Sequence, residues 1–215
     1  MPARTEPLVN DHYYHILNRG VARMPIFITD RDRQRFVDTF LYYTNKDISV
    51  KFSQSIKETD VAKPGGKIVE IISYCLMPNH FHFLLKQVED DGIMNFIRKT
   101  TNSYAKYFNT KRERKGPIFE GKFKAIIVET DEQLIHLSRY IHVNPIAGFV
   151  VKNLNDYKWS SYLEYLGKSG QQVCSKNIIL DQFGSRKSYE KFVLDHVDYA
   201  KQLAKIKHQM LEEHH

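Results

Sequence analysis

The stretch IVEIISYCLMPNHFHFLLK, residues 68–86, decides the fold of this chain. Its first half is strongly apolar, the pair Pro78-Asn79 near its centre favours a turn, and its second half is rich in aromatic and apolar residues. Two such runs joined by a short turn predict an antiparallel β-hairpin. Because successive side chains of a strand point to opposite faces, we expect His80 and His82 to share one face, while the phenylalanines beside them enter the other.

The segments around this hairpin complete a small α+β fold. Hydrophobic periodicity and turn residues predict elements in the order β-α-β-β-α-β-α. That order describes the split βαβ, ferredoxin-like sandwich, an antiparallel four-stranded sheet with helices on one face. The expected elements are a strand at 12–18, a helix at 30–44 capped by Asp30, strands at 68–76 and 80–86, a helix at 93–111, a strand at 123–129 and a helix that starts at Thr130 or Asp131.

Two features mark the limits of these elements. The last helix should end near Asn144, because Pro145 follows and a proline disfavours helical geometry in the residue before it. Residues 46–66 are polar and end in Pro-Gly-Gly, which indicates a long loop. From residue 159 onward the pattern changes to short helical segments, so we expect a small helical appendage at this end of the chain.

The composition excludes several classes of protein. The 215 residues are 42% hydrophobic and 27% charged, which supports one sizeable core and argues against a disordered or collagen-like chain. No run of about 18 apolar residues is present, and the first ten residues lack the apolar segment of a secretory signal. The two cysteines, Cys75 and Cys174, are far apart and indicate neither a disulfide framework nor a zinc finger. We expect a cytoplasmic protein with no membrane segment.

The net charge of +7 is concentrated in one part of the chain. Residues 98–124 contain nine basic and two acidic residues, so this segment carries the whole excess. A basic stripe on a neutral body is typical of proteins that bind a phosphate backbone, and aromatic residues between the lysines can stack on bases. A solvated helix face is the alternative. The basic residues of this stripe are Arg98, Lys99, Lys106, Lys111, Arg112, Arg114, Lys115, Lys122 and Lys124.

Two pairs of residues have the spacing of a reactive site. His80 and His82, on one face of a strand, can chelate a divalent cation through two imidazoles, although an isolated His-x-His also fits a cross-strand polar pair. Tyr140 and Asn144 lie four residues apart, and therefore one above the other on the last expected helix. Tyr140 falls at the edge of the buried stripe of that helix, where an ordinary boundary tyrosine is the alternative.

Four blocks of sequence resemble the tyrosine transposase family typified by the IS200/IS605 elements. They are HYYHILNRG (12–20), YCLMPNHFHFLL (74–85), GPIFEGKFKA (116–125) and YIHVNPIAGFV (140–150). The resemblance is closest to the branch associated with repetitive extragenic palindromes (REP), and it covers roughly residues 10–166. The ferredoxin-like fold of this family agrees with the order of strands predicted above.

The resemblance implies a metal-dependent endonuclease and strand transferase, a transposase, that acts on single-stranded DNA with hairpin or palindromic ends. His80 and His82 match the paired histidines (the HUH motif) that bind a divalent ion, Mg²⁺ or Mn²⁺, and Asn144 is implied as a third ligand. Tyr140 matches the nucleophile, which forms a 5′-phosphotyrosine and frees a 3′-hydroxyl. The catalytic domain would span residues 1–158 and the C-terminal helical extension residues 159–215.

The resemblance also implies a bacterial, nucleoid-associated protein, and leaves both a monomer and a homodimer open, since some family members take the tyrosine from a partner subunit. His15, Asn18 and Arg19 of the first block are further candidate DNA contacts, although packing explains His15 equally well. Tyr104 and Tyr107 are rival nucleophiles, but their places on and beside an apolar helix face favour core or stacking roles. A non-catalytic single-strand-binding module and a nicking enzyme or replication initiator of the wider HUH group are the alternative functions.

Overall fold

The computed structural model describes residues 7–48, 50–55 and 66–212. Each strand and long helix expected between residues 12 and 144 is present close to its expected bounds, and the expected loop at 46–66 contains one short helix. Residues 49 and 56–65 of that loop lie outside the described part.

The strands are β1 (Tyr13–Arg19), β2 (Val69–Met77), β3 (His80–Gln87) and β4 (Lys124–Val128). The helices are α1 (Asp30–Tyr43), α2 (Phe52–Ser55), α3 (Gly92–Lys111), α4 (Asp131–Ala147), α5 (Tyr162–Tyr165), α6 (Asn177–Leu180), α7 (Arg186–Leu194) and α8 (Val197–Glu212), with 3₁₀ turns η1 (Val21–Arg23) and η2 (Leu154–Asp156).

The four strands form one antiparallel sheet in the order β2-β3-β1-β4. β3 lies between β2 and β1, so the chain passes from β1 through α1 to a strand two places away and then returns through the hairpin. This is the split βαβ arrangement, and it confirms the predicted α+β, ferredoxin-like class. In the register, His80 lies opposite Arg19 of β1, and His82 lies opposite Leu17 of β1 and Cys75 of β2.

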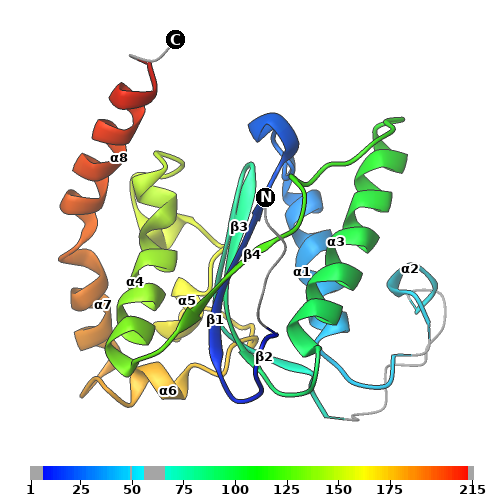
Figure 1. Ribbon diagram of the computed structural model, residues 1–215. Helices are drawn as coiled ribbons and strands as arrows, with labels where there is room; N and C mark the ends of the chain where they lie inside the picture. The colour runs from blue at the N-terminus through cyan, green and yellow to red at the C-terminus, as the bar shows by residue number, and fades with distance from the viewer. Residues whose placement is uncertain (1–6, 49, 56–65, 213–215) are drawn as a thin grey trace.

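Helices cover both faces of this sheet (Figure 1). α1 and α3, which cross between strands, pack against each other on one face. α4 lies on the opposite face against β2 and β3, and α7 and α8 pack on its outer side. The two helices that cross between strands therefore share one face, as expected for this fold, and α4 lies on the other face. None of the helices in the described ranges has the length and apolar content to cross a bilayer.

Aromatic side chains fill the space between the sheet and the layer of α1 and α3. Phe81 and Phe83 of β3 are fully buried, and their ring centroids lie 5.2 and 6.4 Å from that of Phe36 on α1. Tyr104 of α3 packs on Phe36 and donates from its hydroxyl to the carbonyl of Ile26. The face of β3 that carries the phenylalanines thus packs against α1 and α3, and the face that carries the histidines packs against α4.

The start of α1 is tied to the end of α3 through a buried carboxylate. Thr29 and Asp32 form a capping box, so Thr29, and not the predicted Asp30, caps this helix. Asp32 is fully buried, and its carboxylate accepts from Lys111 (2.8 Å) and Arg112 (2.5 Å). Burial by itself would raise the pKa of Asp32, but the hydrogen bonds from Lys111 and Arg112 outweigh it and hold that pKa well below its usual range.

α4 continues through Pro145 to Ala147, so the prediction that it ends near Asn144 is wrong. A proline removes one helical N–H donor, but Pro145 is buried in the core and this packing outweighs the lost bond. The amide of Gly148 donates to the carbonyl of Asn144 (2.7 Å) and closes the last turn. Asn144 therefore keeps its helical position, one turn after Tyr140.

The segment after residue 158 packs directly onto β2 and α4. The carbonyl of Trp159 accepts from the amide of Leu76 (2.9 Å), and the amide of Ser161 donates to the carbonyl of Tyr74 (3.0 Å). Tyr189 of α7 is fully buried in the same hydrophobic cluster as the strands. Helical segments are present after residue 159 as expected, and the division of the chain at 158/159 into two functional parts stays a prediction.

A buried polar network joins α4 to this extension. His142 of α4 is fully buried, with Nδ1 2.8 Å from the hydroxyl of Tyr189 and Nε2 2.7 Å from Oγ of Ser161. The hydroxyl of Tyr189 also lies 3.1 Å from Oγ of Ser138 on α4. Burial lowers the pKa of His142 to about 3, so its ring is neutral near pH 7. The helix that carries Tyr140 is thereby held between the sheet and the extension.

We expect acid to destabilise the protein through His142. Its pKa of about 3 lies below the ordinary value of 6.5, so its contribution to stability is complete above pH 6.5 and is lost progressively as the pH falls toward 3. By pH 5 the loss is about 2 kcal/mol in the free energy of unfolding. In urea unfolding, His142→Gln should be less stable than the wild type at pH 7, yet lose about 2 kcal/mol less between pH 7 and pH 5. Equal losses in the two proteins would contradict this prediction.

Candidate active site

The histidine pair lies on the face of β3 that α4 covers. The ring centroids of His80 and His82 are 4.9 Å apart. His82 is buried, whereas His80, which begins the strand beside the hairpin turn, is partly exposed. The alternation read from the sequence thus brings the two imidazoles together.

Neighbouring groups orient the ring of His80. Its Nδ1 lies 2.7 Å from Oδ1 of Asn79, whose amide nitrogen donates to the carbonyl of Arg23 (3.2 Å). An amide oxygen only accepts hydrogen bonds, so Nδ1 of His80 carries the proton and Nε2 has a free lone pair. Burial, together with the positive charge of Arg19, lowers the pKa of His80 to about 4 and keeps the ring neutral.

A third histidine lies behind the pair. Nε2 of His15, on β1, is 2.9 Å from Nδ1 of His82, and the two rings are nearly parallel with their centroids 5.1 Å apart. Burial lowers the pKa of His15 to about 4 and that of His82 well below its ordinary value. Sequence reasoning treated His15 as a packing or DNA-contact residue and missed this contact, because neither strand alone indicates how β1 pairs with β3.

Tyr140 projects from α4 over the buried histidines. Its ring centroid is 5.7 Å from that of His82 and 6.1 Å from that of His15, in both cases edge to face. The residue is 48% exposed, so part of it is open to solvent. Burial of the remainder raises the pKa of the phenol, and the side chain of Asn144 partly opposes this shift. The structure therefore brings the predicted nucleophile and a predicted metal ligand together within one chain.

The residues present fit a divalent metal ion. Metal-binding histidines usually hydrogen-bond through their second ring nitrogen, and Nδ1 is engaged in both His80 and His82. The described ranges contain no group of three or more His, Cys, Asp or Glu side chains arranged to hold a metal. Asn144 stays the candidate for a third ligand. Its amide nitrogen donates to the carbonyl of Tyr140 (2.8 Å), which keeps the side chain close to α4.

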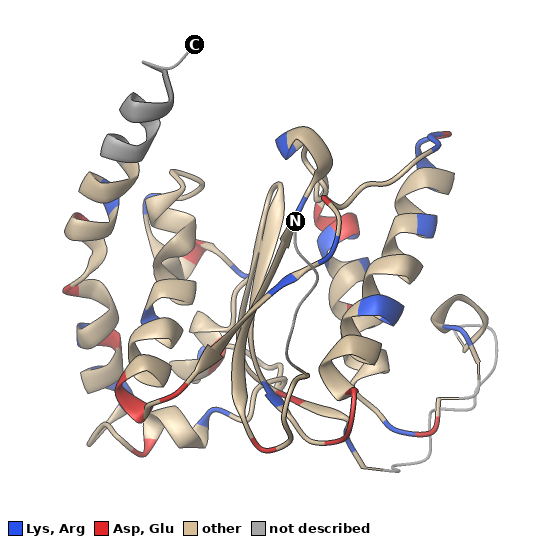
Figure 2. Ribbon diagram, in the orientation of Figure 1, with Lys and Arg blue, Asp and Glu red and all other residues tan. Residues whose placement is uncertain are grey.

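The predicted basic stripe is divided between the two sides of the sheet. Most of it lies on α3 or directly after it, in the layer opposite the histidine face, where Figure 2 shows blue segments along the helix. Lys111 and Arg112 of this group are paired with Asp32. Arg114 donates to Asn109 (3.1 Å) and to the carbonyl of Pro117 (3.0 Å). The group on this side consists of Arg98, Lys99, Lys106, Lys111, Arg112, Arg114 and Lys115.

A groove of about 570 Å³ lies along α3, beside α1 and α2. Arg35 of α1 stacks over the ring of Phe52 (4.2 Å), and its Nε is buried with no hydrogen-bond partner among the described residues. Sequence reasoning missed Arg35 and Lys51 because they are far from the stripe along the chain. Among the described residues, the lining holds six basic side chains and no acidic one, and the six are Arg35, Lys51, Arg98, Lys99, Lys106 and Lys111.

Two predicted DNA contacts do lie on the histidine face. Arg19 of β1 is opposite His80 in the register and forms an ion pair with Glu120. Lys124 of β4 is opposite Leu17, the residue that also faces His82. Arg19 and Lys124 are both exposed, so they place positive charge beside the histidine pair.

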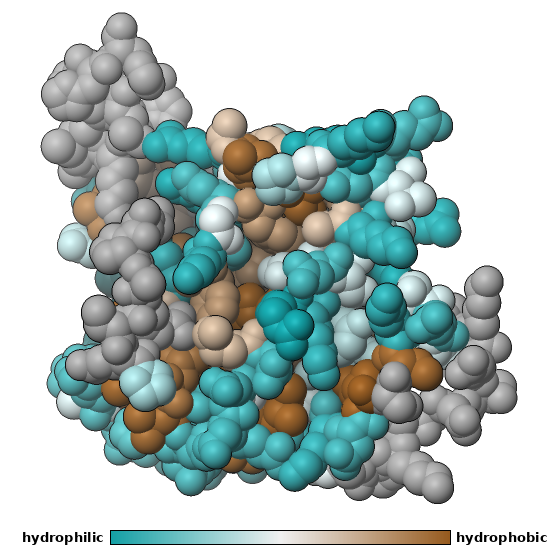
Figure 3. Space-filling model, turned by 45° about the vertical axis from the view of Figure 1, so that its right-hand side comes forward, coloured by the Kyte–Doolittle hydropathy of each residue, from teal (hydrophilic) through white to brown (hydrophobic). Residues whose placement is uncertain are grey.

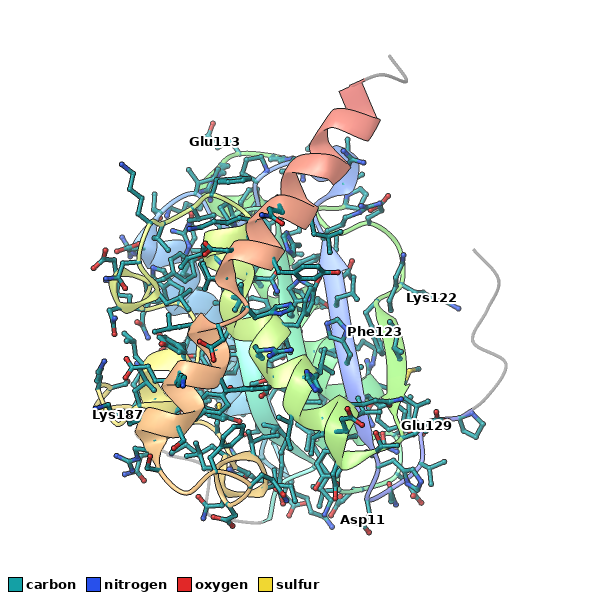
Figure 4. The ribbon with its side chains drawn as sticks, turned by 90° about the vertical axis from the view of Figure 1, so that its left-hand side faces the viewer. Asp11, Glu113, Lys122, Phe123, Glu129 and Lys187 are labelled. Carbon is teal, nitrogen blue, oxygen red and sulfur yellow. The ribbon has the colours of Figure 1, made fainter. Side chains whose placement is uncertain are left out.

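The structure separates four other candidates from the histidines. Asn18 is buried on the opposite face, where its Oδ1 accepts from the amide of Arg19 (2.8 Å). Lys122 lies in the loop before β4 and points away from the body of the protein (Figure 4). Tyr104 is fully buried and Tyr107 donates to Asp32 (3.1 Å), both in the layer of α1 and α3. Both tyrosines therefore lie on the far side of the sheet, Tyr104 in the core and Tyr107 half-buried beside the groove along α3.

β4 leaves the sheet open beside this site. It is an edge strand with two exposed apolar residues, Ile126 and Ile127, and Ile126 lies opposite His15 in the register. Figure 3, which turns the side of α1 and α3 toward the viewer, shows apolar side chains gathered near the middle of the molecule between hydrophilic ones. The histidine face is thus covered by α4 over β2 and β3 but accessible toward β4.

The chain thus has a ferredoxin-like sheet with paired histidines on one strand and a tyrosine on the facing helix, the arrangement that its resemblance to tyrosine transposases led us to expect. The family described as "Transposase IS200 like" matches residues 8–144, and the chain belongs to this family. It is accordingly an enzyme of the transposase class, which sets aside the non-catalytic binding module.

Two individual proteins are similar to this chain. A Haemophilus influenzae protein described as a REP-associated tyrosine transposase is 23% identical over 153 residues, which cover 66% of this chain and 80% of the relative. The solved structure of a REP-associated tyrosine transposase bound to a REP hairpin matches with a TM-score of 0.56 at 16% identity, over 80% of this chain and 89% of the other. At this identity the structural match shows a common fold.

Proposed function

We propose that this protein cleaves and rejoins single-stranded DNA through a covalent 5′-phosphotyrosine on Tyr140. The observation that carries this proposal is the position of Tyr140 over His82, with ring centroids 5.7 Å apart, inside one chain. A nucleophile must reach the same phosphate that the metal site holds, and this proximity permits it. The proximity also favours an active site made within one subunit.

The proposed reaction needs no external energy source, because one bond to phosphorus forms for each one that breaks. The phenolic oxygen of Tyr140 attacks the scissile phosphorus, the bond from phosphorus to the 3′-oxygen breaks, and the strand leaves with a free 3′-hydroxyl. The raised pKa of Tyr140 keeps the phenol protonated near neutral pH, so its proton must leave during attack, and the departing 3′-oxygen takes up one proton. Attack by another 3′-hydroxyl on the phosphotyrosine reverses these changes and joins strands.

His80 and His82 would hold the divalent ion, Mg²⁺ or Mn²⁺, with Asn144 proposed as a third ligand. When bound, such an ion polarises the scissile phosphate and stabilises its developing negative charge. The neutral state of both imidazoles suits this role, because only a neutral ring has a lone pair to donate. Arg19 would add positive charge next to His80.

We further propose that DNA with a hairpin end is the substrate, and that the basic groove along α3 binds its phosphate backbone. Six basic side chains line the described part of this groove, and Lys111 among them is paired with Asp32. Their combined positive charge attracts a polyanion, and this electrostatic attraction is independent of base sequence. The hairpin bound in the related solved structure supports this class of DNA. The groove lies across the sheet from Tyr140, so it would contribute affinity and not chemistry.

The test is formation of a covalent adduct with hairpin-containing single-stranded DNA and Mn²⁺, scored on a denaturing gel. We expect His80→Ala and His82→Ala to lose the adduct while keeping most of their affinity for single-stranded DNA, because the histidines hold the metal and the basic groove supplies the binding. Adduct formation at the wild-type level by both variants would contradict the proposed metal site.

A converse variant controls for indirect effects of these changes. Lys99→Glu combined with Lys106→Glu should weaken DNA binding and reduce its dependence on salt, with Mn²⁺ binding unchanged. Loss of both properties in either set of variants would indicate misfolding, which circular dichroism detects. DNA binding that is unaffected by the two charge reversals would remove the groove from the proposal.

A further inference from the structure

His15 contacts a metal-site histidine and the nucleophile at the same time. Its Nε2 is 2.9 Å from Nδ1 of His82, and its ring packs against the ring of Tyr140 with centroids 6.1 Å apart. His15 is 8% exposed, so solvent has little access to this contact. The planes of the His15 and His82 rings differ by only 19°, as an in-plane hydrogen bond between them requires, and this contact orients the ring of His82.

The direction of this hydrogen bond decides what His82 can do. A neutral imidazole carries one proton, which sits on either Nδ1 or Nε2. If His82 donates from Nδ1, its Nε2 has a lone pair available to a metal ion. If His15 donates instead, the proton of His82 lies on Nε2 and that nitrogen cannot bind a metal. Only the first direction is compatible with His82 as a ligand through Nε2.

We propose that His15 is a positioning residue that accepts the Nδ1 proton of His82 and so selects the tautomer and ring orientation of His82 that bind the divalent ion. This inference rests on the proposed function of His82. It assigns to His15 the part that Asn79 has for His80, where the acceptor is an amide oxygen. Partners of this kind typically account for about 10- to 100-fold in metal affinity.

Metal affinity of the full chain, measured by calorimetry with Mn²⁺ alone, tests the proposal. His15→Phe keeps the volume of a ring and removes the acceptor, so we expect Mn²⁺ to bind about 10- to 100-fold more weakly. His15→Gln supplies a carbonyl oxygen as a new acceptor and should recover much of the affinity. His12→Phe is the matched control, because His12 is an exposed histidine beside the same strand, and it should bind Mn²⁺ like the wild type.

The tautomer of His82 gives a second readout that needs no variant. Long-range proton–nitrogen NMR spectra of the metal-free wild type should show the proton of His82 on Nδ1. In His15→Phe, part or all of that proton should move to Nε2. A wild-type spectrum with the proton on Nε2 would overturn the proposal, even if His15→Phe failed to fold.

The outcomes separate this inference from the proposed function. Equal Mn²⁺ affinity for the wild type and a folded His15→Phe, with binding lost in His82→Ala, would overturn the positioning role and leave the metal site intact. Wild-type protein that does not bind Mn²⁺ would overturn the metal site and the positioning role together. Weaker binding in His15→Phe, with recovery in His15→Gln, supports both.

Discussion

Tyr140→Phe should reduce the covalent protein–DNA adduct to background. The substitution removes the oxygen that bonds to phosphorus and keeps the ring that packs on His82 and His15, so folding and DNA affinity should change little. Denaturing gels score the adduct, while thermal unfolding and gel shifts measure the other two properties. Tyr199→Phe, an exposed tyrosine on α8, is the matched control and should form the adduct normally.

Two further measurements sharpen this result. Peptide mapping of the trapped complex should place the DNA on Tyr140, and DNA on Tyr104 or Tyr107 would refute the choice of nucleophile without changing the family. Mixing Tyr140→Phe with His80→Ala should restore no cleavage, because Tyr140 lies over the histidines of its own chain. Recovered cleavage would show that two subunits share their active sites.

Asp32→Ala should destabilise the protein by about 3–5 kcal/mol, a large part of the stability of a typical domain. The carboxylate is fully buried and accepts hydrogen bonds from Lys111 and Arg112, as well as from the amides of Ile28 (3.2 Å) and Thr29 (3.0 Å). Its removal leaves two cations at the junction of α1 and α3 without their partner, at a cost that exceeds that of losing an exposed ion pair. Urea unfolding at pH 7 measures this change.

Asp38→Ala is the matched control for this measurement. Asp38 is an exposed aspartate on the same helix that accepts from Gln34 (2.8 Å), and its loss should cost less than about 1 kcal/mol. Similar costs for the two variants would show that the buried cluster contributes no more than a surface contact does.

The elements and much of the site could be predicted from sequence because the signals are local. Side chains alternate along β3, so His80 and His82 share one face regardless of which element packs against it. In the same way, residues four apart on any helix lie next to each other, so Tyr140 and Asn144 are neighbours wherever α4 packs. Where local sequence preference and tertiary packing disagreed, tertiary packing determined the structure. Pro145 should end α4 by its own chemistry, but its burial in the core keeps the helix intact.

The sequence by itself determined the strands and helices, their order, the histidine pair, the tyrosine and the family. Only the tertiary structure decided which face α4 covers, and hence that Tyr140 lies over His82 and not over the phenylalanines. It also placed most of the continuous basic stripe on the side of α3, where Arg35 and Lys51 join it in a groove, and left Lys124 on the histidine face. The pairing of β1 with β3 brought His15 to His82. Periodicity is a property of neighbouring residues, whereas strand register, helix placement and ion pairing depend on contacts between residues that are far apart in the chain.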